Sequence, residues 1–234
     1  MKSLLLAIQF LTRLPLPAFV ASDAEFAASM RWFPLVGLLI GALVAGAAVL
    51  AGRGDAWVGA LAALVVWVGV SGALHLDGLA DLADARGAAH GDPARLLAVL
   101  ADPHVGSFGV VAIGLQLIAK LVLLHAAIAA AAWWPLLLIP FAARIGPLVW
   151  TRWLPPLHAG LAARFRDAVR RVDLVLWGLA LIAAAFHWPM ILATPLLLGG
   201  WGLYVRRAIG GISGDGHGAG IELIETLLLA VVLL

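Results

Sequence analysis

Three aspartates lie close together in the segment HLDGLADLADA, residues 75–85. Asp77, Asp81 and Asp84 are spaced i, i+4, i+7, and at about 100° per residue this spacing confines them to roughly 60° of one helix face. Like charges at this spacing destabilise an isolated helix, and more so beside the low-dielectric interior of a membrane. We therefore expect a compensating cation: arginine side chains, or a divalent ion that prefers oxygen ligands, such as Mg²⁺, Ca²⁺ or Mn²⁺.

The alternative interpretation of these aspartates is a solvated helix start, because acidic side chains are favourable near a helix N-terminus. The residues between them are small or apolar, as in Gly78-Leu79-Ala80. This composition favours a helix packed among others with a single acidic stripe. Ionisable groups near membrane depth are functional candidates by default.

A second acidic segment, GGISGDGHGAGIELIE, covers residues 210–225. It combines Asp215 with Glu222 and Glu225. Its glycines would let the backbone approach a ligand closely and expose N–H groups to a phosphate, although a flexible connector is an equal alternative. His217 in this segment is expected to be an isolated loop residue.

Two cations fall inside apolar stretches. Lys120 lies near the middle of one and Arg144 toward the inner end of another. Lys120 needs an acidic or anionic partner at that depth, whereas Arg144 could extend its side chain to the membrane surface. Acids that hold a metal, with basic residues around them, suit a site that handles phosphates, since metal and cations neutralise anionic oxygens.

The composition indicates an integral membrane protein. Of its 234 residues, 64% are hydrophobic and 12% are charged, where a soluble domain has about 25% charged residues. The absence of cysteine excludes disulfides, thiolate catalysis and cysteine-ligated metal sites. The basic residues are scattered among short loops, so they give no indication of nucleic-acid binding and bear first on membrane topology.

We predict an all-α fold, a polytopic membrane bundle of about seven spanning helices, with residues 1–234 forming a single membrane domain. Each stretch approaches the ~20 residues that cross a bilayer, and the fifth and sixth could instead form one hairpin. The predicted spans are 32–51, 56–75, 107–131, 134–151, 173–187, 189–205 and 218–234.

The distribution of lysine and arginine predicts a cytoplasmic N-terminus. With that orientation, twelve such residues lie in the inside segments and Arg53 alone lies outside, which is the expected positive-inside bias. Both acidic segments then face the cytoplasm. The inside residues are Lys2, Arg13, Arg31, Arg86, Arg95, Arg152, Arg164, Arg166, Arg170, Arg171, Arg206 and Arg207.

The sequence resembles the cobalamin synthase family, the adenosylcobinamide-GDP ribazoletransferases. The resemblance is collinear over nearly the whole chain, and the acidic element is its most specific part. It rests on FLTRLPLP (10–17), FPLVGLLIGAL (33–43), HLDGLADLADA (75–85), ADPHVGSFGVVA (101–112) and GISGDGHGAGIELIE (211–225).

The resemblance implies a magnesium-dependent enzyme of the bacterial cytoplasmic (inner) membrane. It would join adenosylcobinamide-GDP to α-ribazole or α-ribazole 5′-phosphate and release GMP. A ribose hydroxyl must then attack a pyrophosphate phosphorus, so a metal and a proton acceptor are needed. An oligomer is left open.

On this resemblance, site roles are expected as follows. Asp77 and Asp81, with Asp84 or Asp215, hold one or two Mg²⁺ ions, and one of the carboxylates, Asp84 in preference to Asp81, removes the hydroxyl proton. The cations expected to neutralise phosphate are Arg86, Lys120 and Arg144.

Two rival functions remain. A membrane alcohol phosphotransferase of phospholipid synthesis also uses an aspartate-rich helix and a metal, but its second aspartate pair, spaced four apart, is missing after Asp81 and Asp84. A secondary transporter binds ions without chemistry and would place acids near mid-depth, whereas here they gather at one predicted surface.

Overall fold

The computed structural model describes residues 2–17, 20–157, 165–166 and 168–232. The regular structure in these ranges is helical. The first half contains α1 (Lys2–Leu11), α2 (Asp23–Ala27), η1 (Ala28–Trp32), α3 (Phe33–Ala51), α4 (Ala56–Ser71), α5 (Leu74–Ala89) and α6 (Pro93–Leu100). The second half contains α7 (Ser107–Ala129), α8 (Trp133–Ala143), α9 (Gly146–Trp153), α11 (Arg171–Ala184), η2 (Pro189–Ala193), α12 (Thr194–Ala208) and α13 (Gly214–Val231).

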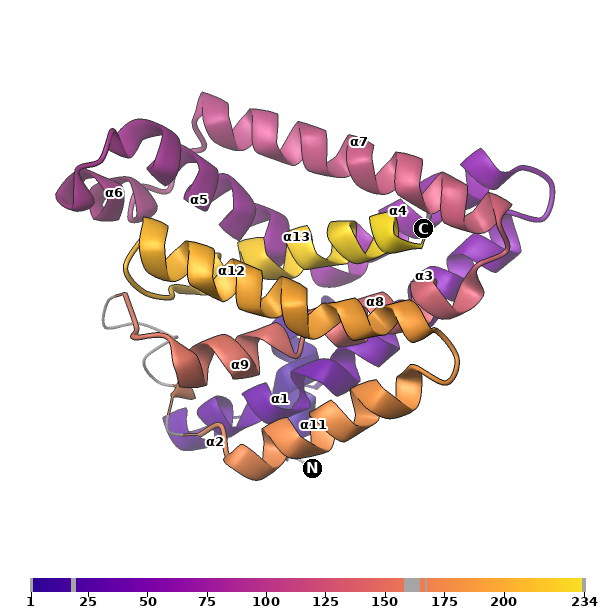
Figure 1. Cartoon of the computed structure of the whole chain (residues 1–234), viewed down its shortest axis with the longest axis horizontal. Helices are drawn as coiled ribbons and strands as arrows, with labels where there is room; N and C mark the ends of the chain where they lie inside the picture. Colours follow the sequence, from indigo (N-terminus) through magenta and orange to yellow (C-terminus); the bar gives the residue numbers. More distant parts are fainter. Residues whose placement is uncertain (1, 18–19, 158–164, 167, 233–234) are drawn as a thin grey trace.

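The last helix, α13, is the centre of the arrangement. It packs against α5, α7, α8 and α12, and Figure 1 shows it, in yellow, running between them. Segments far apart in the sequence therefore meet along one helix. The N-terminal end of α13 contacts the acidic helix α5, where Asp215 and Gly218 lie against Gly78 and His75.

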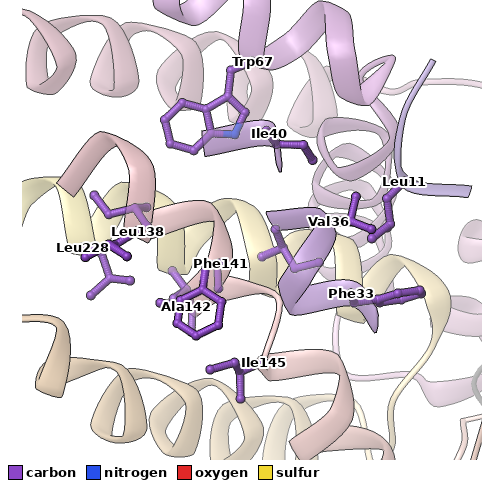
Figure 2. Packing of buried hydrophobic residues seen from close by; sticks show 14 of the residues in the cluster. Leu11, Phe33, Val36, Ile40, Trp67, Leu138, Phe141, Ala142, Ile145 and Leu228 are labelled. Carbon is purple, nitrogen blue, oxygen red and sulfur yellow. The ribbon is translucent and has the colours of Figure 1, made fainter. Parts of the chain in front are cut away.

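The main apolar core lies where α3, α4, α8 and α13 meet, and Figure 2 shows part of it, with Trp67 above Ile40 and Phe141 beside Leu138 and Leu228. Small residues allow the closest of these packings. A Cβ at Gly41 would overlap the backbone of Leu137 in α8. The glycines of the α3 apolar run thus let two helices touch backbone to backbone, as is common in membrane bundles.

The predicted helix over 56–75 is shorter in the structure and ends in a sharp break. Gly72 (φ 60°) and Ala73 (φ 58°) both adopt the left-handed conformation, which glycine tolerates and other residues rarely adopt. The chain then turns by 84° between α4 and α5. The break directs the aspartates of α5 away from the axis of the apolar helix that precedes them.

The predicted helix over 134–151 is present as two pieces, α8 and α9, separated at Arg144 and Ile145. Pro140 lies inside α8 and Pro147 in the first turn of α9, and each lacks the N–H that would continue the backbone hydrogen bonds. In the apolar 18-residue window of Trp133–Trp153, 83% of the residues are buried inside the protein. This segment is therefore a central element of the bundle.

Among the described residues, three helical segments are long and apolar enough to cross a membrane: Asp23–Ala51, Ser107–Ala129 and Trp133–Trp153. The bent pair of α4 and α5 would make a fourth if it counted as one span. The predicted count of seven is not confirmed, because α11 has 14 residues, α12 has 15, and α13 carries three acidic side chains. The all-α class is confirmed for the described residues, and so is the presence of apolar helices long enough to span a membrane.

Candidate active site

The contact between α5 and α13 brings the two acidic segments together. Gly78 faces the first turn of α13, where a Cβ would lie 2.9 Å from the Cα of Asp215. Only a residue without a side chain permits this approach. Asp215 is thereby placed next to the aspartates of α5, about 130 residues away in sequence.

The carboxylates of this cluster repel one another. Asp81 is partly buried and lies among the like charges of Asp77, Asp215 and Asp84. Asp77 is exposed, while Asp81 and Asp215 are half-buried. The acidic stripe thus has the unfavourable electrostatics that the sequence predicted, on a surface that a ligand can reach.

Asp84 has a different environment from the other aspartates. Its carboxylate is buried and accepts hydrogen bonds from the backbone N–H of Gly106 (2.7 Å) and of Gly109 (2.9 Å). Gly106 is the residue before the first turn of α7, where a negative charge is favourable to the helix dipole. The structure therefore gives Asp84 a structural role, holding the start of α7 against α5, which helical spacing alone does not indicate.

Lys120 is buried between two glutamates of α13. Its Nζ lies 2.6 Å from Glu222 Oε2 and 2.6 Å from Glu225 Oε2, and 4.6 Å from the ring centre of Trp67. The expected acidic partner is confirmed. The buried charge of Lys120 is compensated inside the protein, which explains its presence without a phosphate.

Arg144 belongs to the same buried network. It donates to Glu225 Oε1 (2.7 Å) and to the carbonyl of Pro140 (3.0 Å), and its NH2 group lies 3.4 Å from His75 Nδ1. Its side chain does not extend to the surface, because it is fully buried. The phosphate-binding role expected for Lys120 and Arg144 stays a prediction, and the structure accounts for both charges by other means.

Arg86, two residues after Asp84, is exposed. It donates to the carbonyl of Ala208 at the end of α12 (3.0 Å). It also lines a surface cavity between α5, α6 and α12 that includes Arg207 and Gly210. Its side chain is accessible but lines a different cavity from Asp77 and Asp215, so its phosphate-binding role stays a prediction.

The carboxylate oxygens of the cluster are suitable ligands for magnesium if a substrate supplies further ligands. No group of three or more His, Asp or Glu side chains is close enough to hold a metal ion by itself within the described part of the chain. Magnesium is commonly bound through one or two carboxylates together with substrate phosphates and water. Asp77, Asp81 and Asp215 therefore fit an ion that a phosphate-bearing substrate helps to hold.

His217 was expected in a loop and lies instead in the first turns of α13. It is buried, its Nε2 lies 3.2 Å from Thr151 Oγ1, and its ring stacks on Trp150 with 5.9 Å between ring centres. The sequence did contain a signal for the burial of His217. It lies two residues after Asp215, and a helix that begins at Gly214 turns the His217 side chain toward the interior.

These features define a class: a helical protein with apolar helices long enough to span a membrane and a cluster of aspartates built by two helices at the edge of its apolar core. The chain belongs to the cobalamin-5-phosphate synthase family, whose model matches residues 3–233. Members of this family are transferases, and nearly every helix described above lies within the matched residues.

Relatives with a named activity match over almost their full lengths. A protein from Novosphingobium aromaticivorans is 68% identical over 99% of this chain and 96% of its own length. Proteins from Thiobacillus denitrificans (50% identical, 98% and 95%) and Laribacter hongkongensis (53%, 99% and 97%) match similarly. All three are named adenosylcobinamide-GDP ribazoletransferase. No solved structure is significantly similar.

Proposed function

We propose that this protein transfers the adenosylcobinamide-phosphate part of adenosylcobinamide-GDP to α-ribazole or α-ribazole 5′-phosphate and releases GMP. Support comes from the family and from the full-length relatives. The structural observation that carries the proposal is the meeting of Asp77 and Asp81 with Asp215 at the α5–α13 contact. Such a cluster suits the transfer of a group between phosphate oxygens.

Magnesium is the proposed cofactor, held by Asp77 and Asp215 with the pyrophosphate of the donor. Their oxygen donors match the preference of this ion, and a positive charge there relieves the repulsion among the aspartates. When bound, the ion would withdraw charge from the pyrophosphate oxygens as the bond to GMP breaks.

Asp81 is the better candidate for the group that accepts the proton of the attacking ribose hydroxyl. Both oxygens of Asp84, the alternative, already accept backbone hydrogen bonds in a buried site. Asp81 is half-buried and lies one helical turn from Asp77, within reach of a hydroxyl beside the pyrophosphate. Arg86 is proposed to contact a phosphate from the exposed side of α5.

We also propose that the acidic cluster faces the cytoplasm of a bacterial cell, with the N-terminus on the same side. The excess of arginine in the segments that would then be inside supports this orientation,. A soluble, highly charged nucleotide substrate would meet the site without crossing the bilayer. Labelling of single cysteines placed at Arg53 and Arg207 tests it: only the second should react from the cytoplasmic side.

The activity is tested by incubating the purified protein in nanodiscs with adenosylcobinamide-GDP, α-ribazole and Mg²⁺ and measuring GMP. Magnesium-dependent GMP release that requires α-ribazole supports the proposal. CMP release from a CDP-lipid in place of this reaction would indicate the alcohol phosphotransferase. Absence of both reactions in a folded protein would contradict an enzymatic role for the cluster.

A further inference from the structure

His75 lies in the first turn of α5, two residues before Asp77. It lines a cavity of about 160 Å³ together with Asp77, Gly214 and Asp215. His75 is 4% exposed, whereas Asp77 is exposed at the protein surface. One cavity therefore borders both a nearly buried imidazole and the carboxylates at which the donor pyrophosphate is proposed to bind.

Arg144 determines which ring nitrogen of His75 carries a proton. Its NH2 group lies 3.4 Å from His75 Nδ1. A guanidinium has hydrogen-bond donors and no acceptor, so Nδ1 is the acceptor in this contact and the ring proton lies on Nε2. Arg144 is itself held in place, because its NH1 group donates to Glu225 Oε1 (2.7 Å) and to the carbonyl of Pro140 (3.0 Å). The buried charge network thus fixes the tautomer of His75.

The other ring nitrogen, His75 Nε2, has no hydrogen-bond partner in the part of the chain that the structure describes. It is also not fully enclosed by protein. The described polar atoms that are both unpartnered and fully enclosed are Ser29 Oγ, Trp67 Nε1, Arg144 Nε and His217 Nδ1. The small accessible part of the imidazole therefore includes the Nε2–H group, and the cavity shared with Asp77 is where a ligand can meet it.

The position of the proton limits what His75 can do. With a proton on Nε2, this nitrogen has no lone pair with which to bind Mg²⁺ or to accept the proton of a hydroxyl. It can donate a hydrogen bond to an oxygen of a ligand. Phosphate oxygens carry negative charge, and hydrogen bonds to charged acceptors are about twice as strong as those between neutral groups. A nearly buried donor beside Asp77 therefore matches a phosphate that is bound there.

We propose that His75 is a substrate-binding residue whose Nε2–H donates to an oxygen of the donor pyrophosphate, and that Arg144 is the positioning residue that keeps the proton on Nε2. The inference rests on the proposed function and deepens it. The network of Lys120, Glu225 and Arg144 then has a role beyond charge compensation, because it orients a side chain that contacts the substrate. Arg144 acts on the phosphate through His75 and does not touch it.

Two substitutions at His75 separate its two nitrogens. His75→Asn places an amide oxygen near the position of Nδ1, where it can accept from Arg144, but it has no atom at the position of Nε2. His75→Gln places an amide N–H near the position of Nε2 and leaves Arg144 without its acceptor. His90→Asn is the matched control. His90 is exposed beyond the far end of α5 with φ 47°, a backbone conformation that asparagine tolerates.

The first measurements are calorimetric binding of adenosylcobinamide-GDP with Mg²⁺, and KM and kcat for GMP release, all in nanodiscs. His75→Asn should weaken donor binding, or lower kcat/KM for the donor, by about tenfold to a hundredfold, the effect of one hydrogen bond to a charged group. His75→Gln should lose less. KM for α-ribazole and the unfolding temperature should stay near the wild-type values in His75→Asn. His90→Asn should change none of these quantities.

The tautomer of His75 is measured independently of activity. In protein with ¹⁵N-labelled histidine, the ring signals of His75 are those that disappear in His75→Asn. Their chemical shifts should show the proton on Nε2, and the Nε2 signal should move when adenosylcobinamide-GDP binds. A proton on Nδ1 alone would overturn the role of Arg144 and remove the donor that the proposal requires.

The variants give further results that would overturn the proposal. Wild-type donor affinity and turnover in folded His75→Asn would show that Nε2 does not contact the substrate. Equal losses in His75→Asn and His75→Gln, accompanied by lower unfolding temperatures, would show that the imidazole serves packing alone. A raised KM for α-ribazole only would assign the contact to the acceptor. Failure of the proposed function is distinct, since wild-type protein would then release no GMP, whatever the tautomer of His75.

Discussion

The carboxylate of Asp84 accepts a hydrogen bond from the backbone N–H of Gly109 at 2.9 Å, across the contact between α5 and α7. Gly106 donates a second one at 2.7 Å, so both oxygens of this buried group face the start of α7. A Cβ on either glycine would collide with the carboxylate. Asp84 and the two glycines form a structural contact between α5 and α7, next to the aspartate cluster.

This contact predicts that Asp84→Asn lowers the stability of the fold more than it lowers the catalytic rate. The amide would set an N–H against a backbone N–H and remove the negative charge, which should lower the free energy of unfolding by about 2 kcal/mol. Thermal unfolding in detergent measures the loss. Asp92→Asn is the control, because Asp92 caps the exposed helix α6 with one such bond and asparagine caps equally well. A stable but inactive Asp84→Asn protein would restore Asp84 as the proton acceptor.

Asp81→Asn should show the opposite pattern. The change removes the proposed general base, and such a group contributes about 10²–10⁴-fold to a rate, so GMP release should fall by that factor. It also removes repulsion from Asp77 and Asp215, so the unfolding temperature should be equal to or above that of the wild type. Loss of turnover together with loss of stability would instead indicate that the Asp81 carboxylate supports the fold.

The buried network of Lys120 and Arg144 predicts that the stability of the fold depends on equal numbers of buried positive and negative charges. Two cations face Glu222 and Glu225, so Lys120→Met leaves one uncompensated buried negative charge, at a cost of about 3–5 kcal/mol. The double variant Lys120→Met/Glu222→Gln keeps the Arg144–Glu225 pair and should recover most of that loss. Thermal unfolding of the two variants tests the balance.

The same double variant distinguishes the structural role of Lys120 from phosphate binding. If Lys120 serves the network alone, KM for adenosylcobinamide-GDP in the double variant should equal the wild-type value. A KM that stays raised after stability has recovered would show that the ammonium group contacts the substrate. Arg86→Ala, at an exposed position, provides the comparison in which a raised KM is expected.

Periodicity and composition were sufficient to predict the long apolar helices and to place Asp77 and Asp81 on one helix face. They also required an acidic partner for Lys120, and α13 supplies it. The break at Gly72 was not predicted, because apolar residues continue across it and the left-handed backbone at Ala73 leaves no trace in hydropathy. The count of seven spans is not confirmed for a related reason: in the sequence, short apolar helices buried against protein resemble helices buried in lipid.

The roles of individual polar residues were the hardest to predict. Helical spacing placed Asp84 with the other aspartates, and the difference lies in its partners, the backbone N–H groups of Gly106 and Gly109. Such partners come from another helix and depend on how α5 and α7 cross. The burial of His217 depends in the same way on the position of α9, which provides Thr151 and Trp150.

The arrangement of the carboxylates predicts that magnesium and donor bind together. Since the described residues form no cage of three ligands, the unliganded protein should bind Mg²⁺ weakly, and the pyrophosphate should complete the coordination. We expect saturating Mg²⁺ to tighten adenosylcobinamide-GDP binding by about tenfold or more, equivalent to a coupling of roughly 1.4 kcal/mol. Calorimetry in nanodiscs, with and without Mg²⁺, measures this coupling.

Controls separate coupling at the site from formation of a magnesium–nucleotide complex in solution. Asp77→Asn and Asp215→Asn should abolish the coupling while the donor still binds, because a ligand to the ion has been lost from the protein side. Asp84→Asn, measured below its unfolding temperature, should retain it, because both Asp84 oxygens serve the backbone of α7. Tight Mg²⁺ binding without nucleotide that disappears in Asp84→Asn would contradict this assignment and place a preformed metal centre on α5.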